Sequence, residues 1–345
     1  MKKWKYLTAT ALLTLALAAC GAEEESSNDT ATEDTATEQT TSGTEDAKFP
    51  MTVSPLTPGS EDEETGTSIV FEDVTLEEQP ERLVVLDYGF LDTLDALGVE
   101  GVVGVAQNGG KGFLPENLKE KYFKDDIADA GSLKELNLEA IAAAEPDVIF
   151  ISGRQSAYYE ELKEITPNVI FIASDNKDYV QGIYESVDLA AKIFGKEEKA
   201  EELKAAFQEK VDALKEKAAG YENALVTMYN EKKLSGFDNG EDSRFAYVYN
   251  DFGFKPAVTG IETSSHGSDF SFESILKVNP EVLLVIDRGA NEEVAKADVE
   301  NDIIKQTRAY KEGKVVYLDG TTWYFSSGGI TTEASKIDEI LNELK

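Results

Sequence analysis

The sequence predicts an α/β fold of two lobes with mostly parallel sheets, joined by one long rigid helix, with a ligand cleft between the lobes. Three observations predict this fold. Strand-like and helix-like segments alternate after about residue 67, which is typical of parallel sheets. Residues 138–154 and 272–288 carry the same pattern at a spacing of 134 positions. Between residues 179 and 221 the alternation gives way to helical periodicity alone.

The N-terminus carries an export signal of the kind found on lipoproteins. Basic residues in Met1–Tyr6 precede an apolar stretch, Leu7–Ala19, that is too short to span a membrane. Small residues then lead to Cys20, which resembles the bacterial lipoprotein box. We interpret residues 1–19 as a signal peptide and Cys20 as the lipidated first residue of the mature chain. Ordinary signal cleavage beside an incidental cysteine is the alternative. A diacyl anchor would hold the chain at the extracytoplasmic face of the cell membrane.

Residues 20–66 read as an acidic, disordered tether. From Gly21 to Thr65 the chain holds 13 acids and one lysine, so it repels itself and cannot bury a core. The whole chain carries a net charge of −34, which excludes a nucleic-acid binder because such proteins present a basic face. Arginines inside a cleft are therefore stronger evidence for an anion-binding site, because the rest of the surface would repel an anion.

The N-terminal lobe is expected over residues 67–178. Its expected elements are, in order, an edge strand at Thr67–Leu76, a buried strand at Arg82–Asp87, a helix at Leu91–Leu97 stopped by Gly98, a strand at Gly101–Ala106, the first repeat copy and a strand at Asn168–Ala173.

Residues 179–221 are expected to be helical and to join the lobes. The charged segment Lys196–Lys217 places apolar residues at three- and four-residue spacing, so it predicts a long amphipathic helix that serves as a rigid spine. We therefore expect little hinge closure. The C-terminal lobe follows over residues 222–345, with strands at Ala224–Tyr229 and Lys314–Leu318, the second repeat copy, and a closing helix at Thr331–Leu344.

Each repeat copy reads as a capped helix that opens with a glutamate, a proline break, and an apolar strand that ends at an arginine. The glutamates are Glu139 and Glu273, and the arginines are Arg154 and Arg288. Ligands of open α/β sheets bind at the carboxyl ends of strands, so both lobes are expected to present a guanidinium to the cleft. The alternative is that helix–proline–strand is a common unit whose arginines lie on the surface.

A third arginine, Arg244, follows a turn that contains glycine. Arginine keeps its charge and recognises planar oxygen anions through a fork of donors. At ~5 Å and an effective dielectric of ~20, each guanidinium would contribute roughly 3 kcal/mol toward a unit negative charge, so three could balance a trianion. A structural salt bridge is the alternative for Arg244.

Two residues are candidate iron ligands. His266 lies in a polar loop, and Tyr324 lies in an aromatic run after a strand. Phenolate oxygen is a hard donor that suits Fe³⁺. The alternatives are a solvated histidine and an aromatic packing residue.

Catalytic and cofactor motifs are missing from the sequence. His266 is the single histidine and Cys20 the single cysteine, so a metal site of several histidines, a disulfide and a thiolate nucleophile are excluded. No G-x-S-x-G, H-E-x-x-H or G-x-x-x-x-G-K-[ST] pattern occurs, and the glycine-rich segment 104–112 reads as a loop. We expect a protein that is not an enzyme and has no intrinsic cofactor.

From about Ser68 onward the chain resembles the helical-backbone (class III) binding proteins that serve bacterial ABC importers, and most of all the catecholate siderophore-binding lipoproteins of the petrobactin/enterobactin type. The residues that carry the resemblance are Gly153–Ser156, Ser243–Phe245, His266–Gly267, Ser271–Glu273, Ile286–Gly289 and Trp323–Tyr324. One departure is Ala246, where relatives often have glycine.

The resemblance implies a role for each candidate residue. In this family three arginines line the floor of the cleft and bind catecholate oxygens, and they match Arg154, Arg244 and Arg288. His266 and Tyr324 would coordinate iron directly when the siderophore supplies only two catechols.

The resemblance also implies that Glu139 and Glu273 dock the lobes onto a permease dimer, although acids at helix N-termini also simply favour the helix dipole. Fe³⁺ would arrive as a siderophore chelate, and we expect a monomer that binds no nucleic acid. A haem- or corrinoid-binding importer protein and a surface adhesion or scaffold protein are the alternative functions.

Overall fold

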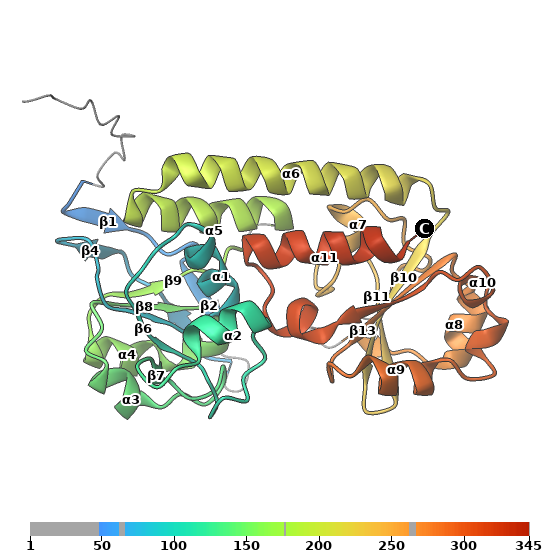
Figure 1. Cartoon of the computed structure of the whole chain (residues 1–345), viewed down its shortest axis with the longest axis horizontal. Coiled ribbons are helices and arrows are strands. Elements are labelled where there is room, and N and C mark those ends of the chain that lie inside the picture. The colour runs from blue at the N-terminus through green and yellow to red at the C-terminus, as the bar shows by residue number, and fades with distance from the viewer. Residues whose placement is uncertain (1–47, 62–65, 176, 262–266, 345) are drawn as a thin grey trace, which may run out of the picture. The chain divides into compact units, whose positions relative to one another are not determined.

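Each lobe is built on a five-stranded sheet, and Figure 1 shows the two sheets with the helices around them. The computed structural model describes residues 48–61, 66–175, 177–261 and 267–344. The predictions for residues 1–19, Cys20 and His266 therefore lie outside the described residues. The predicted α/β fold of two lobes is confirmed.

All strand pairs of the N-terminal sheet are parallel, in the order β7-β6-β5-β8-β9. Parallel strands that are covered on both faces read as continuous apolar runs, and the central strands of this sheet are fully buried. The strands are β5 (Leu83–Val85), β6 (Val102–Val105), β7 (Ala128–Asp129), β8 (Val148–Ile151) and β9 (Val169–Phe171). The helices are α1 (Tyr88–Ala96), α2 (Glu116–Tyr122), α3 (Leu138–Ala143), the 3₁₀ helix η1 (Gly153–Tyr158) and α4 (Tyr159–Ile165).

The C-terminal sheet is mixed, in the order β12-β11-β10-β13-β14. Strands β10, β13 and β14 are parallel, whereas β11 pairs antiparallel with both β10 and β12. The β10–β11 connection consists of Glu231 and Lys232, both at positive φ, which is the geometry of a type I′ hairpin. The strands are β10 (Ala224–Asn230), β11 (Lys233–Phe237), β12 (Ser268–Asp269), β13 (Val282–Asp287) and β14 (Val315–Asp319). The helices are α7 (Tyr247–Asn250), α8 (Phe272–Val278), α9 (Glu292–Val299), the 3₁₀ helix η2 (Ile304–Gln306) and α10 (Arg308–Lys311).

The predicted edge strand at Thr67–Leu76 is wrong as a single strand. It is divided into β3 (Ser68–Val70) and β4 (Val74–Leu76), which pair with β2 (Gly59–Glu61) and β1 (Met51–Val53). Phe71 lies between the two strands, where it is buried and stacks on Phe171 at a centroid distance of 4.1 Å. Strands β1 and β2 lie within the segment 20–66 that we predicted as a tether. The tether and the predicted segment boundaries at 67, 179 and 222 stay predictions.

The long amphipathic helix predicted between the lobes is present as α6 (Glu197–Ala219). It packs along α5 (Tyr179–Phe194) and α11 (Ile330–Glu343), as Figure 1 shows. One hydrophobic cluster holds buried residues of both sheets together with Phe207, Val211 and Leu214 of α6. The spine helix therefore shares a core with each lobe. None of the helices in the described part of the chain is long and apolar enough to cross a membrane.

The chain returns from the C-terminal lobe to the N-terminal lobe just before α11. The π-helical turn η3 (Thr321–Phe325) follows β14, and the segment 326–329 then passes over α1. A Cβ on Gly89 of α1 would lie 2.3 Å from the Ser327 carbonyl oxygen, so this close approach requires glycine. Asp92 of α1 accepts hydrogen bonds from the backbone N–H groups of Thr331 (2.8 Å) and Thr332 (3.1 Å). The N-terminal lobe thereby caps a helix that has no side-chain cap of its own.

Candidate functional site

A cavity of about 390 Å³ is lined by residues from both lobes. Its size lies within the range of small-molecule sites. Two of the three predicted arginines line it, together with the predicted tyrosine. The lining residues are Tyr88, Asn108, Gly112, Phe113, Ser132, Leu133, Lys134, Arg154, Arg288, Tyr324 and Phe325.

The repeated pattern positions the first and third arginines as its spacing predicts. Asn137 caps α3 by accepting a hydrogen bond from Ala140 N (3.1 Å), and Ser271 caps α8 by accepting one from Ser274 N (3.2 Å). In both lobes a buried strand follows, and the arginine comes within three residues of the strand's carboxyl end. Arg154 lies in η1, and Arg288 donates its backbone N–H to Tyr229 O at 3.1 Å.

All three arginines converge on Tyr324. Arg154 and Arg244 each donate from Nη2 to the carbonyl oxygen of Tyr324, at 3.2 Å and 2.7 Å. The guanidinium carbon of Arg244 lies 4.1 Å from the centroid of the Tyr324 ring, and that of Arg288 lies 4.8 Å from it. Cations over an aromatic face are attracted by the ring quadrupole. Tyr324 therefore holds three like charges close together.

This cluster of positive charge lacks carboxylate partners among the residues that the structure describes, since Arg154, Arg244 and Arg288 make no ion pair there. Burial, and next the positive charge of Arg154, lower the pKa of Arg244, although a guanidinium stays protonated in a protein. The Nε of Arg288 is buried without a hydrogen-bond partner in the described part of the chain. Unneutralised, partly buried cations attract an anion.

Only one of the two predicted iron ligands, Tyr324, lies among the described residues. Tyr324 is buried at the cavity wall, but His266 lies outside the described residues, so their joint role stays a prediction. Within the described ranges, no group of three or more His, Cys, Asp or Glu side chains could hold a metal ion. Burial raises the pKa of Tyr88 well above its ordinary value, and its hydroxyl donates to Ala106 O, so Tyr88 remains a neutral phenol.

Sequence reasoning missed several lining residues. Lys134 adds a third cation to the cavity wall, beside Arg154 and Arg288, and Phe113 and Phe325 add aromatic surface. Phe113 follows the glycine-rich segment that we interpreted only as a loop. No local sequence signal distinguishes Lys134 from the other exposed lysines of the chain. Only the fold shows that its loop lies at the cavity.

The predicted docking residues, Glu139 and Glu273, occupy matching places in the two lobes. Each is exposed in the first helical turn, of α3 and α8 respectively. Their carboxylates favour the helix dipole there.

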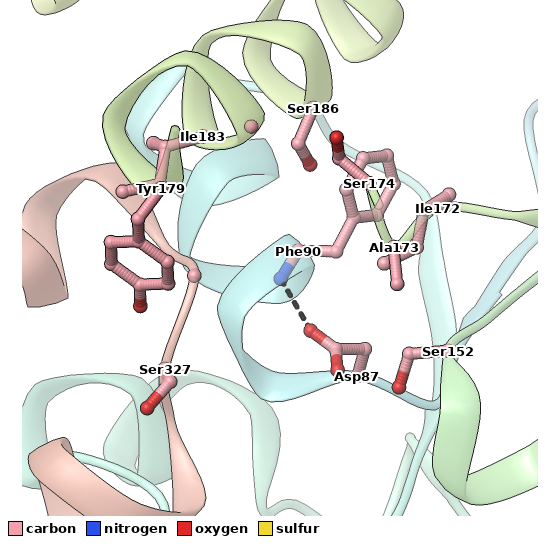
Figure 2. Close-up of a pocket in the computed structure, with 12 residues that line it drawn as sticks. Asp87, Phe90, Ser152, Ile172, Ala173, Ser174, Tyr179, Ile183, Ser186 and Ser327 are labelled. Atoms are coloured by element: carbon pink, nitrogen blue, oxygen red, sulfur yellow. Dashed lines mark hydrogen bonds between the residues drawn. The ribbon is translucent and has the colours of Figure 1, made fainter. Parts of the chain in front are cut away.

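A second cavity, of about 190 Å³, has a different chemistry (Figure 2). Figure 2 shows the hydroxyls of Ser152, Ser174, Ser186 and Ser327 around it, with the apolar ring of Phe90. Its carboxylate, Asp87, caps α1 by accepting a hydrogen bond from Phe90 N at 2.9 Å. None of its lining residues is cationic, so it lacks the charge of the arginine-lined cavity.

The chain matches a family and several characterised proteins. A family model described as periplasmic binding protein matches residues 83–322. The petrobactin-binding protein YclQ of Bacillus subtilis (strain 168) is 35% identical over 353 residues and is aligned over 100% of both chains. Its crystal structure superposes with a TM-score of 0.71, covering 83% of this chain and 98% of YclQ.

Two further proteins extend the comparison. The ferric-anguibactin-binding protein FatB of Vibrio anguillarum (strain ATCC 68554 / 775) is 34% identical over 271 residues, covering 76% of this chain and 82% of FatB. The structure of the periplasmic catecholate-siderophore binding protein VctP of Vibrio cholerae gives a TM-score of 0.69 at 32% identity, covering 78% of this chain and 96% of VctP.

Proposed function

Because the chain belongs to the periplasmic binding protein family, we propose that it is an extracytoplasmic substrate-binding lipoprotein that captures ferric catecholate siderophores and delivers them to an ABC permease. One observation carries the proposal. Arg154, Arg244 and Arg288 come from both lobes and meet at Tyr324 without a carboxylate partner in the described structure. The names of YclQ and VctP, which specify petrobactin and a catecholate siderophore, support the same ligand class.

The charge of the cavity fits a compact polyanion. A ferric catecholate keeps a net negative charge because each catechol loses two protons on binding iron. At ~5 Å and an effective dielectric of ~20, one guanidinium would contribute roughly 3 kcal/mol toward each unit of that charge. Lys134 at the cavity wall adds to the attraction. The Fe³⁺ arrives as part of the ligand, and the protein supplies no resident cofactor.

Tyr324 and His266 are proposed as direct iron ligands for chelates that leave coordination positions open. Phenolate oxygen and imidazole nitrogen are both donors that ferric iron accepts. A bis-catecholate leaves such positions, whereas a tris-catecholate fills them. A Tyr324→Phe variant that loses the visible charge-transfer shift with bis-catecholates, but not the binding of tris-catecholates, would support this assignment.

The first experiment is a fluorescence titration of the unlipidated mature chain. Trp4 lies in the predicted signal peptide, so Trp323 beside Tyr324 is the reporting tryptophan. Saturable sub-micromolar quenching by ferric bis- and tris-catecholates, and none by a ferric hydroxamate or haem, is expected. Quenching by haem alone would favour a haem-binding protein, and no saturable response would favour a surface adhesion or scaffold protein.

Arginine variants test the cation cluster directly. Arg244→Gln is expected to weaken catecholate binding at least tenfold, because roughly 3 kcal/mol of attraction is lost before screening. Arg308→Gln is the matched control, since Arg308 pairs with Glu222 and Glu312 outside the cavity. Equal affinities for both variants would reject the proposed role of the arginines.

Delivery is proposed to use Glu139 and Glu273 as docking points for a permease dimer. Their exposure in matching helical turns of the two lobes supports this role. In vesicles that contain the permease, Glu139→Ala with Glu273→Ala is expected to abolish uptake without changing ligand affinity. Glu216→Ala on α6 is the control. Uptake at the wild-type rate by the double variant would contradict docking through these residues.

The membrane location is proposed to depend on a lipid at Cys20, with the protein acting as a monomer. Cys20→Ala is expected to move the mature protein from the detergent phase to the aqueous phase. Detergent partitioning that the substitution leaves unchanged would argue against the anchor.

A further inference from the structure

Phe113 is exposed at the mouth of the arginine-lined cavity. It keeps 40% of its surface exposed and is one of only three large hydrophobic side chains that are exposed within the described residues. Its ring stacks on Phe325 at a centroid distance of 4.1 Å and an interplanar angle of 9°. Both rings line the cavity. The pair therefore presents an aromatic face beside the cations.

The two rings are held in place from opposite lobes. Phe113 follows Gly112, where a Cβ would lie 2.4 Å from the hydroxyl of Tyr88, so glycine lets the loop approach that closely. Ser326 donates a hydrogen bond from Oγ to Phe113 O at 3.2 Å. Phe325 also contacts Tyr324 edge to face at 5.0 Å and 78°. A continuous aromatic row thus runs from the cavity mouth to the arginines.

The arginines alone cannot select among anionic iron chelates. A guanidinium attracts carboxylate, phosphate and catecholate oxygens alike. Stacking, by contrast, requires a π face on the ligand and gains free energy beyond simple burial of area. The stacked pair is therefore the part of the cavity that distinguishes an aryl chelate from an aliphatic one.

We propose that the Phe113–Phe325 stack selects chelates that carry aryl rings over anionic chelates that lack them, through an aryl ring of the ligand that covers the exposed face of Phe113. This inference rests on the proposed function, because it specifies which ferric chelates the site prefers. A purely structural role for the stack would not explain why Phe113 keeps so much exposed surface at the cavity.

The test compares two substitutions of Phe113 with two ligand classes. Phe113→Leu keeps an apolar side chain but removes the ring, and Phe113→Tyr keeps the ring. Dissociation constants are measured on the mature chain by fluorescence titration with a ferric bis-catecholate and with ferric citrate. Val294→Ala, at an exposed apolar position that does not line the cavity, is the control.

Phe113→Leu is expected to weaken ferric bis-catecholate binding about three- to tenfold and to leave ferric citrate binding unchanged. Phe113→Tyr is expected to restore the wild-type affinity. If wild-type protein binds no ferric citrate, the selectivity is already evident, and the loss in Phe113→Leu with recovery in Phe113→Tyr is still required.

Equal weakening of both ligands by Phe113→Leu, or no weakening of either, would overturn the inference. Failure of the proposed function would give a different result. If the proposed function is wrong, the wild-type protein binds no ferric catecholate, or Arg244→Gln binds it as tightly as the wild type does. Catecholate binding that depends on Arg244 but not on the Phe113 ring would overturn the aryl selectivity alone.

Discussion

Replacing Lys336 with methionine is expected to destabilise the protein by about 3–5 kcal/mol, because it leaves a buried carboxylate without its partner. Lys336 and Glu333 are both fully buried, and Nζ lies 2.6 Å from Glu333 Oε1. Burial lowers the pKa of Lys336, and the neighbouring carboxylate opposes that shift. Methionine preserves the length of the apolar stem, so the loss of charge is the main change.

The surroundings of the pair set this magnitude. Glu333 Oε1 also accepts hydrogen bonds from Tyr179 Oη (2.8 Å) and Gly328 N (2.8 Å), while Oε2 is buried and has no partner in the described structure. The ammonium further lies 5.4 Å from the Trp323 ring centroid. Glutamine at position 333 can still accept the two hydrogen bonds. Glu333→Gln with Lys336→Met is therefore expected to lie within about 2 kcal/mol of the wild type, since no charge stays buried.

Urea denaturation at neutral pH measures both effects. A loss below about 1 kcal/mol at neutral pH, or a double variant as unstable as the single one, would refute this account of the pair.

Three further predictions concern stability. Burial, and next the neighbouring Asp178, raise the pKa of Asp251 to about 6. The folded state therefore holds this proton more tightly than the unfolded state does, and wild-type stability should fall as pH rises from about 4 to about 6. Asp251→Asn should flatten that fall and raise the free energy of unfolding by about 2 kcal/mol at pH 8, as measured by urea titration. An unchanged dependence of stability on pH would count against the raised pKa of Asp251. Asp92→Ala should cost about 2 kcal/mol, because it strips two backbone donors of α11 of their acceptor. Equal urea midpoints for this variant and the wild type would show that water replaces the cap. Gly89→Ala should lower the melting temperature by several degrees, whereas Gly153→Ala, which meets no atom within 4 Å, should not. Similar melting temperatures for these two variants would contradict the close packing of α1 against the crossover.

The sequence predicted those features that depend on neighbours along the chain. The capped helices and the strand-end arginines of the two repeats follow from local hydrogen bonding and apolar periodicity, and they lie where the repeats predicted them. The structure identifies the caps as Asn137 and Ser271. The family inferred from short motifs was confirmed as well.

Other features depend on contacts that no local pattern records. The hairpin at Glu231 and Lys232 has positive φ at two residues that rarely adopt it, so the usual Asn-Gly signal of such a turn was missing. The antiparallel part of the C-terminal sheet was therefore not predicted.

The cavity wall shows the same limit. The convergence of Arg244 on Tyr324 joins residues 80 positions apart. The aromatic stack of Phe113 on Phe325 likewise joins residues of the two lobes that are far apart in the sequence.

The cap that Asp92 provides for α11 also bears on how the chain matures. Its two hydrogen-bond donors lie 239 and 240 residues further along the sequence, so the N-terminal lobe gains this contact only when the distant end of the chain has been made. Contacts of such long separation slow folding, because a large loop must close before they form. For a chain exported as we propose, such slow closure would favour folding after the chain has crossed the membrane, because the N-terminal lobe gains this contact only when α11 is present.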